Sequence, residues 1–277
     1  MYKGLFAMNS TIFDLLTKDY SIQLATNEED FEIIKNLRHK MYGPIYNLPY
    51  NTMEEKGYLF SEDDTQSFNY LLRHNDSDTY VGTVRVFFVN NKTPATQLPM
   101  QKDGNVDDID HLTQERPICE ISRLALSNNL PKHPSFSTLK LRTCLSLALM
   151  VATRINYFLY HYTTVFSVME YSLERILKRQ NVHFEEVGKA TEYYGIRIPF
   201  AIQREKLIKD TEINMGEITR YYLQELCQNP EPFWSFIDNN PYLDSSDIEL
   251  DKISNLFETH GKDVDLDLLL SQETSLS

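Results

Sequence analysis

The sequence predicts a mixed α/β fold, in which a central mixed, mostly antiparallel sheet has helices on both faces and a helical, acidic extension follows it. Segments rich in Val, Ile, Phe and Thr alternate with helix-like segments as far as about residue 205. In the middle of this region several strand-like segments follow one another directly, which indicates antiparallel pairing. Beyond it no convincing strand occurs. We therefore expect an N-terminal extension over 1–19, a domain over 20–205 and a C-terminal extension over 206–277.

Strands are expected where β-branched and apolar residues concentrate between turn-forming residues. They cover residues 20–25, 68–73, 79–89, 118–127, 165–169, 182–187 and 191–203. In the strand over 118–127 the polar residues Glu120 and Ser122 alternate, and Arg123 falls out of step. This break predicts a bulge or the end of pairing at Arg123.

Helices are expected over 10–19, 26–42, 137–158 and 171–179, and helical or irregular structure over 204–227 and 232–270. Thr26 and Glu29 have the spacing of a capping box, and Gly43 followed by Pro44 predicts the end of that helix. The residues over 43–66 are rich in Pro, Tyr and turn formers, so an irregular loop is expected there. The helix over 137–158 is apolar around most of its surface, which predicts burial on more than one side.

Charge is distributed unevenly along the 277 residues. The chain carries 27 Lys and Arg against 40 Asp and Glu, a net charge of −13. Residues 228–277 hold eleven acidic and two basic residues, so they account for −9 and the first 227 residues for −4. Residues 128–169 hold four basic residues and no acidic one. The overall acidity argues against a general nucleic-acid binder, and a hydrophobic content of 42% excludes a disordered chain.

The three cysteines, Cys119, Cys144 and Cys227, have neither the spacing of a zinc site nor an even number for disulfide pairing. We expect reduced thiols, no metal and a cytoplasmic protein. No apolar run reaches the length of about 18–20 residues that a membrane-spanning helix needs. A transmembrane segment is therefore not expected, whereas a peripheral membrane contact remains open.

Three short motifs occur in a fixed order, with an acidic residue after the first. They are Leu37-Arg38 with Met41-Tyr42, Gly82-Thr83-Val84-Arg85 and Cys119-Glu120-Ile121-Ser122-Arg123, and Asp64 lies between the first two. This order resembles the acyl-homoserine-lactone (autoinducer) synthases of the GNAT acyltransferase superfamily. Residues 168–200 look closer to the bacterial PEP-CTERM/exosortase system-associated acyltransferases and to the N-acyl amino acid synthases. The resemblance covers about residues 20–205 and implies a GNAT-like three-layer αβα sandwich.

The resemblance implies acyl transfer from a thioester to an amine. Acyl transfer needs a base, and donors that stabilise the oxyanion. Glu120 is the predicted base, and Arg123 is grouped with it as catalytic. The alternative is that Glu120 pairs with Arg123 or Arg85 for structure alone. Backbone N–H groups from Leu124 to Leu126 would bind the thioester carbonyl if the strand bulges there.

The acceptor pocket is predicted from the other polar residues of the motifs. Arg38, Asp64 and Arg85 would shape it, and one arginine would hold an acceptor carboxylate in a bidentate manner. The alternative for each arginine is an ordinary salt bridge. Tyr171 would protonate the leaving thiolate, although with 17 tyrosines in the chain a packing or surface role is the stronger interpretation.

Lys132, Lys140 and Arg142 lie at or before the start of the long predicted helix. They are the predicted site for the phosphopantetheine phosphate or for the acidic face of acyl-carrier protein, and a solvated basic face is the alternative. No glycine occurs between Ser127 and Leu141, which favours acyl-carrier protein over coenzyme A because a backbone cradle for pyrophosphate normally needs glycine.

The sequence thus predicts an N-acyltransferase that moves a fatty acyl group from acyl-carrier protein to the amine of an amino acid or similar metabolite. No permanently bound cofactor is expected, only the acyl-thioester co-substrate. Two alternatives stay open: a signal synthase of the homoserine-lactone type that uses S-adenosylmethionine, and a non-catalytic GNAT-like module that binds an acyl chain or a partner protein. The only Trp, Trp234, lies in the extension, which argues against the first alternative because those synthases usually carry a Trp soon after the first motif.

Overall fold

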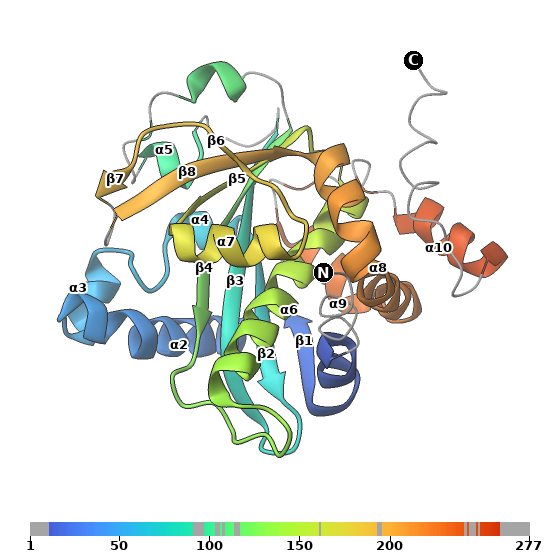
Figure 1. Ribbon diagram of the computed structural model, residues 1–277, viewed down its shortest axis with the longest axis horizontal. Helices are drawn as coiled ribbons and strands as arrows, with labels where there is room; N and C mark the ends of the chain where they lie inside the picture. The colour runs from blue at the N-terminus through green and yellow to red at the C-terminus, as the bar shows by residue number, and fades with distance from the viewer. Residues whose placement is uncertain are drawn as a thin grey trace. The chain divides into compact units, whose positions relative to one another are not determined.

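The chain folds as a mixed α/β protein (Figure 1). The computed structural model describes residues 11–90, 97–102, 106, 109–113, 117–160, 162–192, 196–240, 243, 248 and 250–260. Within these residues eight strands form a mostly antiparallel sheet in the order β1-β2-β3-β4-β5-β8-β6, and β7 pairs with β8 beside this path. The predicted mixed α/β architecture with a mostly antiparallel sheet is confirmed.

The strands fall close to the predicted segments. They are β1 (Tyr20–Leu24), β2 (Phe68–His74), β3 (Thr79–Val89), β4 (Ile118–Leu126), β5 (Thr164–Met169), β6 (Glu185–Glu186), β7 (Thr191–Glu192) and β8 (Ile196–Gln203). The strand predicted over 182–187 is shorter, with Glu185–Glu186 as its paired part. The single strand predicted over 191–203 is wrong, because β7 and β8 pair antiparallel with each other, and residues 193–195 between them lie outside the described residues.

The helices include the four predicted ones and several short ones. They are α2 (Glu28–Tyr46), α3 (Tyr50–Glu55), α4 (Glu62–Thr65), α5 (Pro99–Lys102), α6 (Thr138–Leu159), α7 (Tyr171–Arg179), α8 (Arg204–Gln228), α9 (Glu231–Asp238) and α10 (Leu250–His260). A helical segment over 11–14 continues as a π-helical turn, Leu15–Asp19, and Asp110–Leu112 forms a 3-10 turn. No helix in the described ranges combines the length and the apolar character of a membrane span.

Three local predictions about α2 and the segment after it are wrong. Asn27, not Thr26, is the N-cap, because its side chain accepts a hydrogen bond from the Asp30 N–H at 3.0 Å. The helix continues through Pro44 to Tyr46, since a proline in the last turn removes only one helical hydrogen bond, and it ends where Asn47 takes a left-handed conformation. The expected loop over 43–66 contains α3 and α4.

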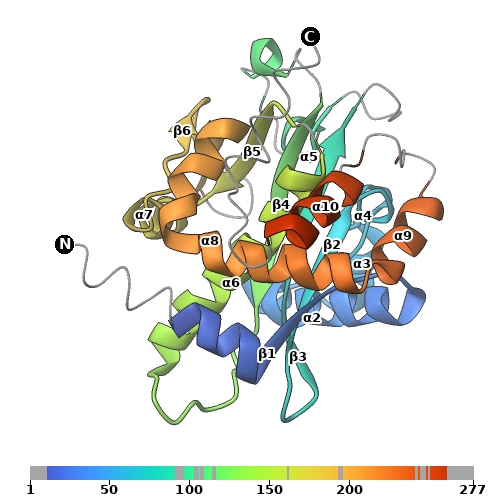
Figure 2. The same cartoon turned by 90° about the vertical axis from the view of Figure 1, so that its right-hand side faces the viewer.

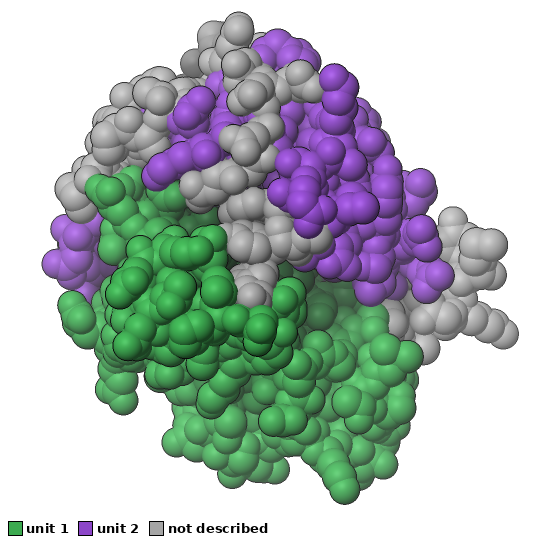
Figure 3. Space-filling view, turned by 90° about the vertical axis from the view of Figure 1, so that its left-hand side faces the viewer, with its two compact units in different colours: residues 1–87, 121–153 green, residues 88–120, 154–277 purple. Residues whose placement is uncertain are grey.

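The chain divides into two compact units, coloured separately in Figure 3. Unit 1 holds residues 1–87 and 121–153, and unit 2 holds residues 88–120 and 154–277. Strands β3 and β4 and helix α6 each contribute residues to both units. The two units are described one at a time.

In unit 1, β2 pairs antiparallel with β1 and with β3. Gly82 on β3 faces α6, because a Cβ built there would lie 2.9 Å from Leu149 Cδ1 and 3.2 Å from the Ala125 carbonyl oxygen. A side chain at this position would have to displace the Leu149 side chain and press on the Ala125 carbonyl, so glycine suits this close approach. Side chains alternate along a strand, so Thr83 and Arg85 point to the opposite face, where α2 packs. Figure 2 shows α2 and α6 on opposite sides of these strands.

In unit 2, the first residues of β4 pair parallel with β5, and β5 pairs antiparallel with β8. The predicted C-terminal extension begins inside α8, which follows β8 directly. Helix α8 is attached to the end of α6 by two buried arginines: Arg154 Nη1 donates to Thr219 Oγ1 at 2.8 Å, and Arg204 Nε donates to the Tyr157 carbonyl at 2.7 Å. Helix α10 contacts α8 (Figure 2).

We expect Thr219→Val to lower the free energy of unfolding by about 1–3 kcal/mol, because it removes a hydroxyl that accepts from a buried guanidinium without changing side-chain volume much. Urea denaturation measures the change. Thr138→Val, at an exposed position, is the control. Equal stability of the two variants would contradict the structural role of the Arg154–Thr219 contact.

Candidate functional site

The buried carboxylate of Asp64 lies at the centre of the polar contacts in unit 1. Asp64 Oδ1 accepts from Arg38 Nη1 at 2.8 Å, and Oδ2 lies 3.4 Å from Arg85 Nη1. Asp64 Oδ2 also accepts from the backbone N–H and the hydroxyl of Ser61, at 2.9 and 3.2 Å. All three charged side chains are at most 2% exposed. The predicted grouping of Arg38, Asp64 and Arg85 therefore exists in the structure.

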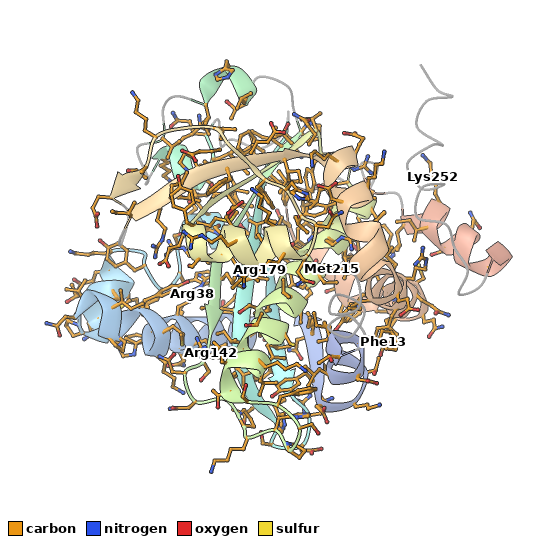
Figure 4. The ribbon with its side chains drawn as sticks, in the orientation of Figure 1. Phe13, Arg38, Arg142, Arg179, Met215 and Lys252 are labelled. Atoms are coloured by element: carbon orange, nitrogen blue, oxygen red, sulfur yellow. The ribbon has the colours of Figure 1, made fainter. Side chains whose placement is uncertain are left out.

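Arg38 connects α2 with three other parts of unit 1 (Figure 4). In addition to Asp64, its guanidinium donates to the Leu59 carbonyl at 2.9 Å and to Asn69 Oδ1 at 3.2 Å. Asn69 in turn donates to the Asp64 backbone carbonyl at 2.8 Å. Arg38 is thus a fixed member of a buried network rather than a surface salt bridge.

Arg85 and Arg123 extend the network to β4. Arg85 Nε donates to Ser122 Oγ at 3.1 Å, and Arg123 Nη1 donates to the Tyr58 carbonyl at 3.0 Å. Arg85 is 1% exposed, whereas Arg123 is only half-buried. Among the three arginines, Arg123 is therefore the one that solvent or a ligand can reach.

The pKa values of Asp64 and Arg38 depend on their burial and on the charged groups around them. Burial by itself would raise the pKa of Asp64, but the guanidinium groups of Arg38, Arg85 and Arg123 and the Ser61 N–H hold it well below its usual value. Burial lowers the pKa of Arg38, and the neighbouring arginines act in the same direction while Asp64 opposes them. Three guanidinium groups thus act together to keep one buried carboxylate ionised.

Strand β4 is irregular at the position that the sequence pattern marks. Arg123 has a φ of 57°, the left-handed conformation that residues other than glycine rarely adopt. Ser122, Arg123 and Leu124 are half-buried, while the remaining residues of the strand are buried. In unit 2 the parallel register of β4 with β5 runs from Ile118↔Thr164 to Glu120↔Phe166. A left-handed residue turns the peptide planes on either side of it out of strand geometry.

Glu120 lies at the end of this register, in unit 2. Its side chain is 3% exposed, and its Oε2 accepts from the Met100 backbone N–H at 2.8 Å. The Met100 segment is itself fixed, because the Leu98 N–H donates to Gln101 Oε1 at 3.0 Å. The predicted base is therefore a buried carboxylate with at least one oxygen in a defined orientation.

The predicted thiolate acid, Tyr171, is 46% exposed. Its hydroxyl donates to Glu186 Oε2 at 3.0 Å, and this hydrogen bond raises the pKa of Tyr171. Its role as an acid stays a prediction. Cys119 and Cys144 are free and buried, and burial raises the pKa of both thiols, so neither has the features of a nucleophile.

The predicted carrier residues lie around the start of α6, in unit 1. Lys132 and Lys140 are exposed, and Arg142 is half-buried, with its Nη1 donating to the Ser127 carbonyl at 2.7 Å. At the first turn of α6 the Lys140 N–H donates to Ser137 Oγ at 3.3 Å. Lys140 and Arg142 lie in the first turns of α6 and Lys132 lies in the segment before it, and their contact with a carrier stays a prediction.

Several residues of the site are missing from the sequence-based prediction. Ser61 holds Asp64, Asn69 holds Arg38, and the Met100 N–H holds Glu120. The spacing of Ser61 and Asp64 is that of a capping box, so this pair was recognisable from sequence. The roles of Asn69 and Met100 depend on contacts between distant segments and leave no local pattern.

Comparisons with known proteins give likenesses to solved structures only. No family model matches the chain, and no curated protein matches it in sequence. FeeM, an N-acyl amino acid synthase from uncultured soil microbes, is 10% identical with a TM-score of 0.48, over 71% of this chain and 96% of FeeM. The acyl-homoserine-lactone synthase LasI is 13% identical with a TM-score of 0.43, over 70% and 95% of the two chains. BjaI, a CoA-dependent acyl-homoserine lactone synthase, is 15% identical with a TM-score of 0.44, over 72% and 89%.

We expect Asp64→Asn to lower the free energy of unfolding at pH 7 by about 3–5 kcal/mol, because it leaves buried guanidinium groups without their carboxylate. The pKa of Asp64 is lowered in the folded state, so its contribution is present above the unfolded pKa of about 3.9 and is lost as the pH falls through the lower folded value. The difference between wild type and variant should therefore shrink below about pH 4.

Urea denaturation at a series of pH values tests this prediction. Asp14→Asn is the control, since Asp14 pairs with Lys18 at 2.8 Å but is 59% exposed and should contribute less than about 1 kcal/mol. A difference for Asp64→Asn that stays constant from pH 7 to pH 3 would contradict the prediction.

Proposed function

We propose that this protein is an N-acyltransferase that transfers a fatty acyl group from acyl-carrier protein to the amine of an amino acid. The observation that supports it most is the composition of β4, which carries a buried carboxylate, Glu120, and, three residues later, the half-buried Arg123, at which the strand is distorted. The nitrogen of the amine attacks the thioester carbonyl, a carbon–nitrogen bond forms and the carbon–sulfur bond breaks. The amine loses a proton, and the carrier leaves as its thiol.

Glu120 is the proposed general base. A carboxylate that is 3% exposed and held by the Met100 N–H has a fixed orientation, which general-base catalysis requires. The distortion at Arg123 supports the role of the Leu124 and Leu126 backbone N–H groups as oxyanion donors, because it turns the adjacent peptides out of regular strand geometry.

Arg123 is the proposed partner of the acceptor carboxylate. It is half-buried, while Arg38 and Arg85 are buried and bonded to Asp64. A guanidinium can hold a carboxylate in a bidentate manner, so amino acids should be better acceptors than amines without a carboxylate. S-adenosylmethionine also carries a carboxylate and therefore belongs among the acceptors to be tested.

The acyl donor is proposed to approach the start of α6. Lys132, Lys140 and Arg142 supply three positive charges there, and the first turn of a 22-residue helix supplies backbone N–H groups and the positive end of its dipole. A single phosphate on an acidic protein, as on acyl-carrier protein, suits this arrangement.

Incubation of the protein with acyl-carrier thioesters and a panel of amino acids, their decarboxylated amines and S-adenosylmethionine tests the proposal. Release of free carrier thiol is the measurement. We expect release with at least one amino acid, a higher KM for its decarboxylated amine, and a 10²–10⁴-fold lower kcat for Glu120→Gln, because that variant lacks the base.

Glu185→Gln, an exposed glutamate on β6, is the matched control and should keep wild-type turnover. No release with any acceptor and acyl length would refute the enzymatic function and favour a binding module. Wild-type turnover of Glu120→Gln would refute the role of Glu120.

A further inference from the structure

Leu139 is an exposed apolar side chain at the start of α6. It is 77% exposed, the highest value among the large hydrophobic residues that the described part of the chain leaves exposed, whereas Leu141 two residues later is 1% exposed. Isolated exposed leucines are common on protein surfaces and need no explanation by themselves. The surroundings of Leu139 are what distinguish it.

Leu139 and four residues near it in the chain are here called the α6 entry surface: Lys132, Phe136, Leu139, Lys140 and Arg142. Lys132 and Lys140 are exposed, and Phe136 and Arg142 are half-buried. Lys140 Nζ lies 4.5 Å from the centre of the Phe136 ring, which stacks on His133 at 4.3 Å. Arg142 is held by the Ser127 carbonyl. Lys140 and Arg142 are thus each in contact with a neighbouring group.

Negative charge is sparse at this surface. Residues 128–169 contain no Asp or Glu. One acidic group contacts the segment within the described part of the chain: Asp19 Oδ2 lies 3.5 Å from His133 Nε2. The surface therefore combines a net positive charge with an exposed apolar residue among the cations.

This combination fits a folded acidic protein better than a small anion or a polyanion. A free phosphate uses the cations and gains nothing from Leu139. Protein interfaces commonly have an apolar anchor inside a polar or charged rim, and the anchor contributes much of the binding energy. Complementary charge on the rim mainly accelerates association and selects the partner.

We infer that Leu139 is the apolar anchor by which this protein docks acyl-carrier protein, with Lys132, Lys140 and Arg142 as the charged rim. The inference rests on the proposed function for the identity of the partner. It adds a residue that touches the protein part of the donor rather than the acyl chain or the acceptor.

Leu139→Ser tests the inference when two donors are compared. Acyl-carrier protein has a protein surface, and the corresponding acyl-pantetheine has none. We expect the ratio of kcat/KM for the carrier donor to kcat/KM for acyl-pantetheine to fall at least tenfold, through KM of the carrier. Ile45→Ser is the matched control, since Ile45 is 65% exposed on α2 and should leave the ratio unchanged.

Salt separates the anchor from the rim. The loss caused by Leu139→Ser should persist at 0.5 M salt, whereas the loss caused by Lys140→Gln should diminish, because screening weakens exposed charges and leaves apolar contacts intact. Thermal unfolding of each variant by circular dichroism shows whether the fold is retained.

Direct binding of fluorescently labelled carrier protein, measured by anisotropy, keeps the docking inference separate from catalysis. Carrier binding that weakens at least tenfold in Leu139→Ser supports the inference even if no acceptor gives turnover, in which case only the proposed function fails. An unchanged donor ratio with unchanged carrier binding overturns the inference. Binding to anionic phospholipid vesicles instead of carrier, with the same loss in Leu139→Ser, also overturns it.

Discussion

The buried ion pair between Asp64 and Arg38 is the constraint on which unit 1 depends. Removing two charges from water costs several kcal/mol for each ion, so the pair is tolerated only when further hydrogen bonds complete it. Ser61, Asn69 and the Leu59 carbonyl supply such bonds, and Arg85 Nη1 lies 3.4 Å from the carboxylate as a second cation. Because these groups come from β2, β3 and the segment before α4, the buried carboxylate on α4 fixes the positions of these elements. The segment from Tyr58 to Ser61, between α3 and α4, is held by hydrogen bonds to these charged side chains rather than by regular secondary structure.

Strand β4 is regular in its first residues and distorted in its middle. Its first residues are regular, buried and paired with β5, and they hold the Glu120 carboxylate in a fixed orientation. Its middle residues are half-buried, and Arg123 adopts a left-handed backbone, which costs of order 1–3 kcal/mol for a residue other than glycine. Such strain persists where surrounding contacts enforce it, and functional sites are where it concentrates. In unit 1 the guanidinium contact to the Tyr58 carbonyl is one such restraint.

Basic and acidic residues are concentrated in different parts of the chain. The basic residues at the start of α6 lie in a segment without acidic residues, and the −9 of the last fifty residues is concentrated elsewhere. The extension is not a uniform appendage, because α8 follows β8 without a linker and its Thr219 accepts from the buried Arg154. Helices α9 and α10 add buried residues such as Phe233, Phe236 and Ile253 to the core of unit 2.

Local pattern determined much of the fold: β3 and α7 begin and end where composition and periodicity predict, and the break in alternation at Arg123 marks the distortion of β4. Each of these depends on residues close in sequence. The order Arg38, Asp64, Arg85 predicted a cluster, but only tertiary structure decided which arginine is accessible, because burial depends on what packs over each side chain. Only tertiary structure decided the hydrogen bonds of Asn69 and Met100 as well, because these bonds join segments 20 or more residues apart. Helix α2 ends at the left-handed backbone of Asn47. Pro44 does not end it, because a proline in the last turn removes only one helical hydrogen bond.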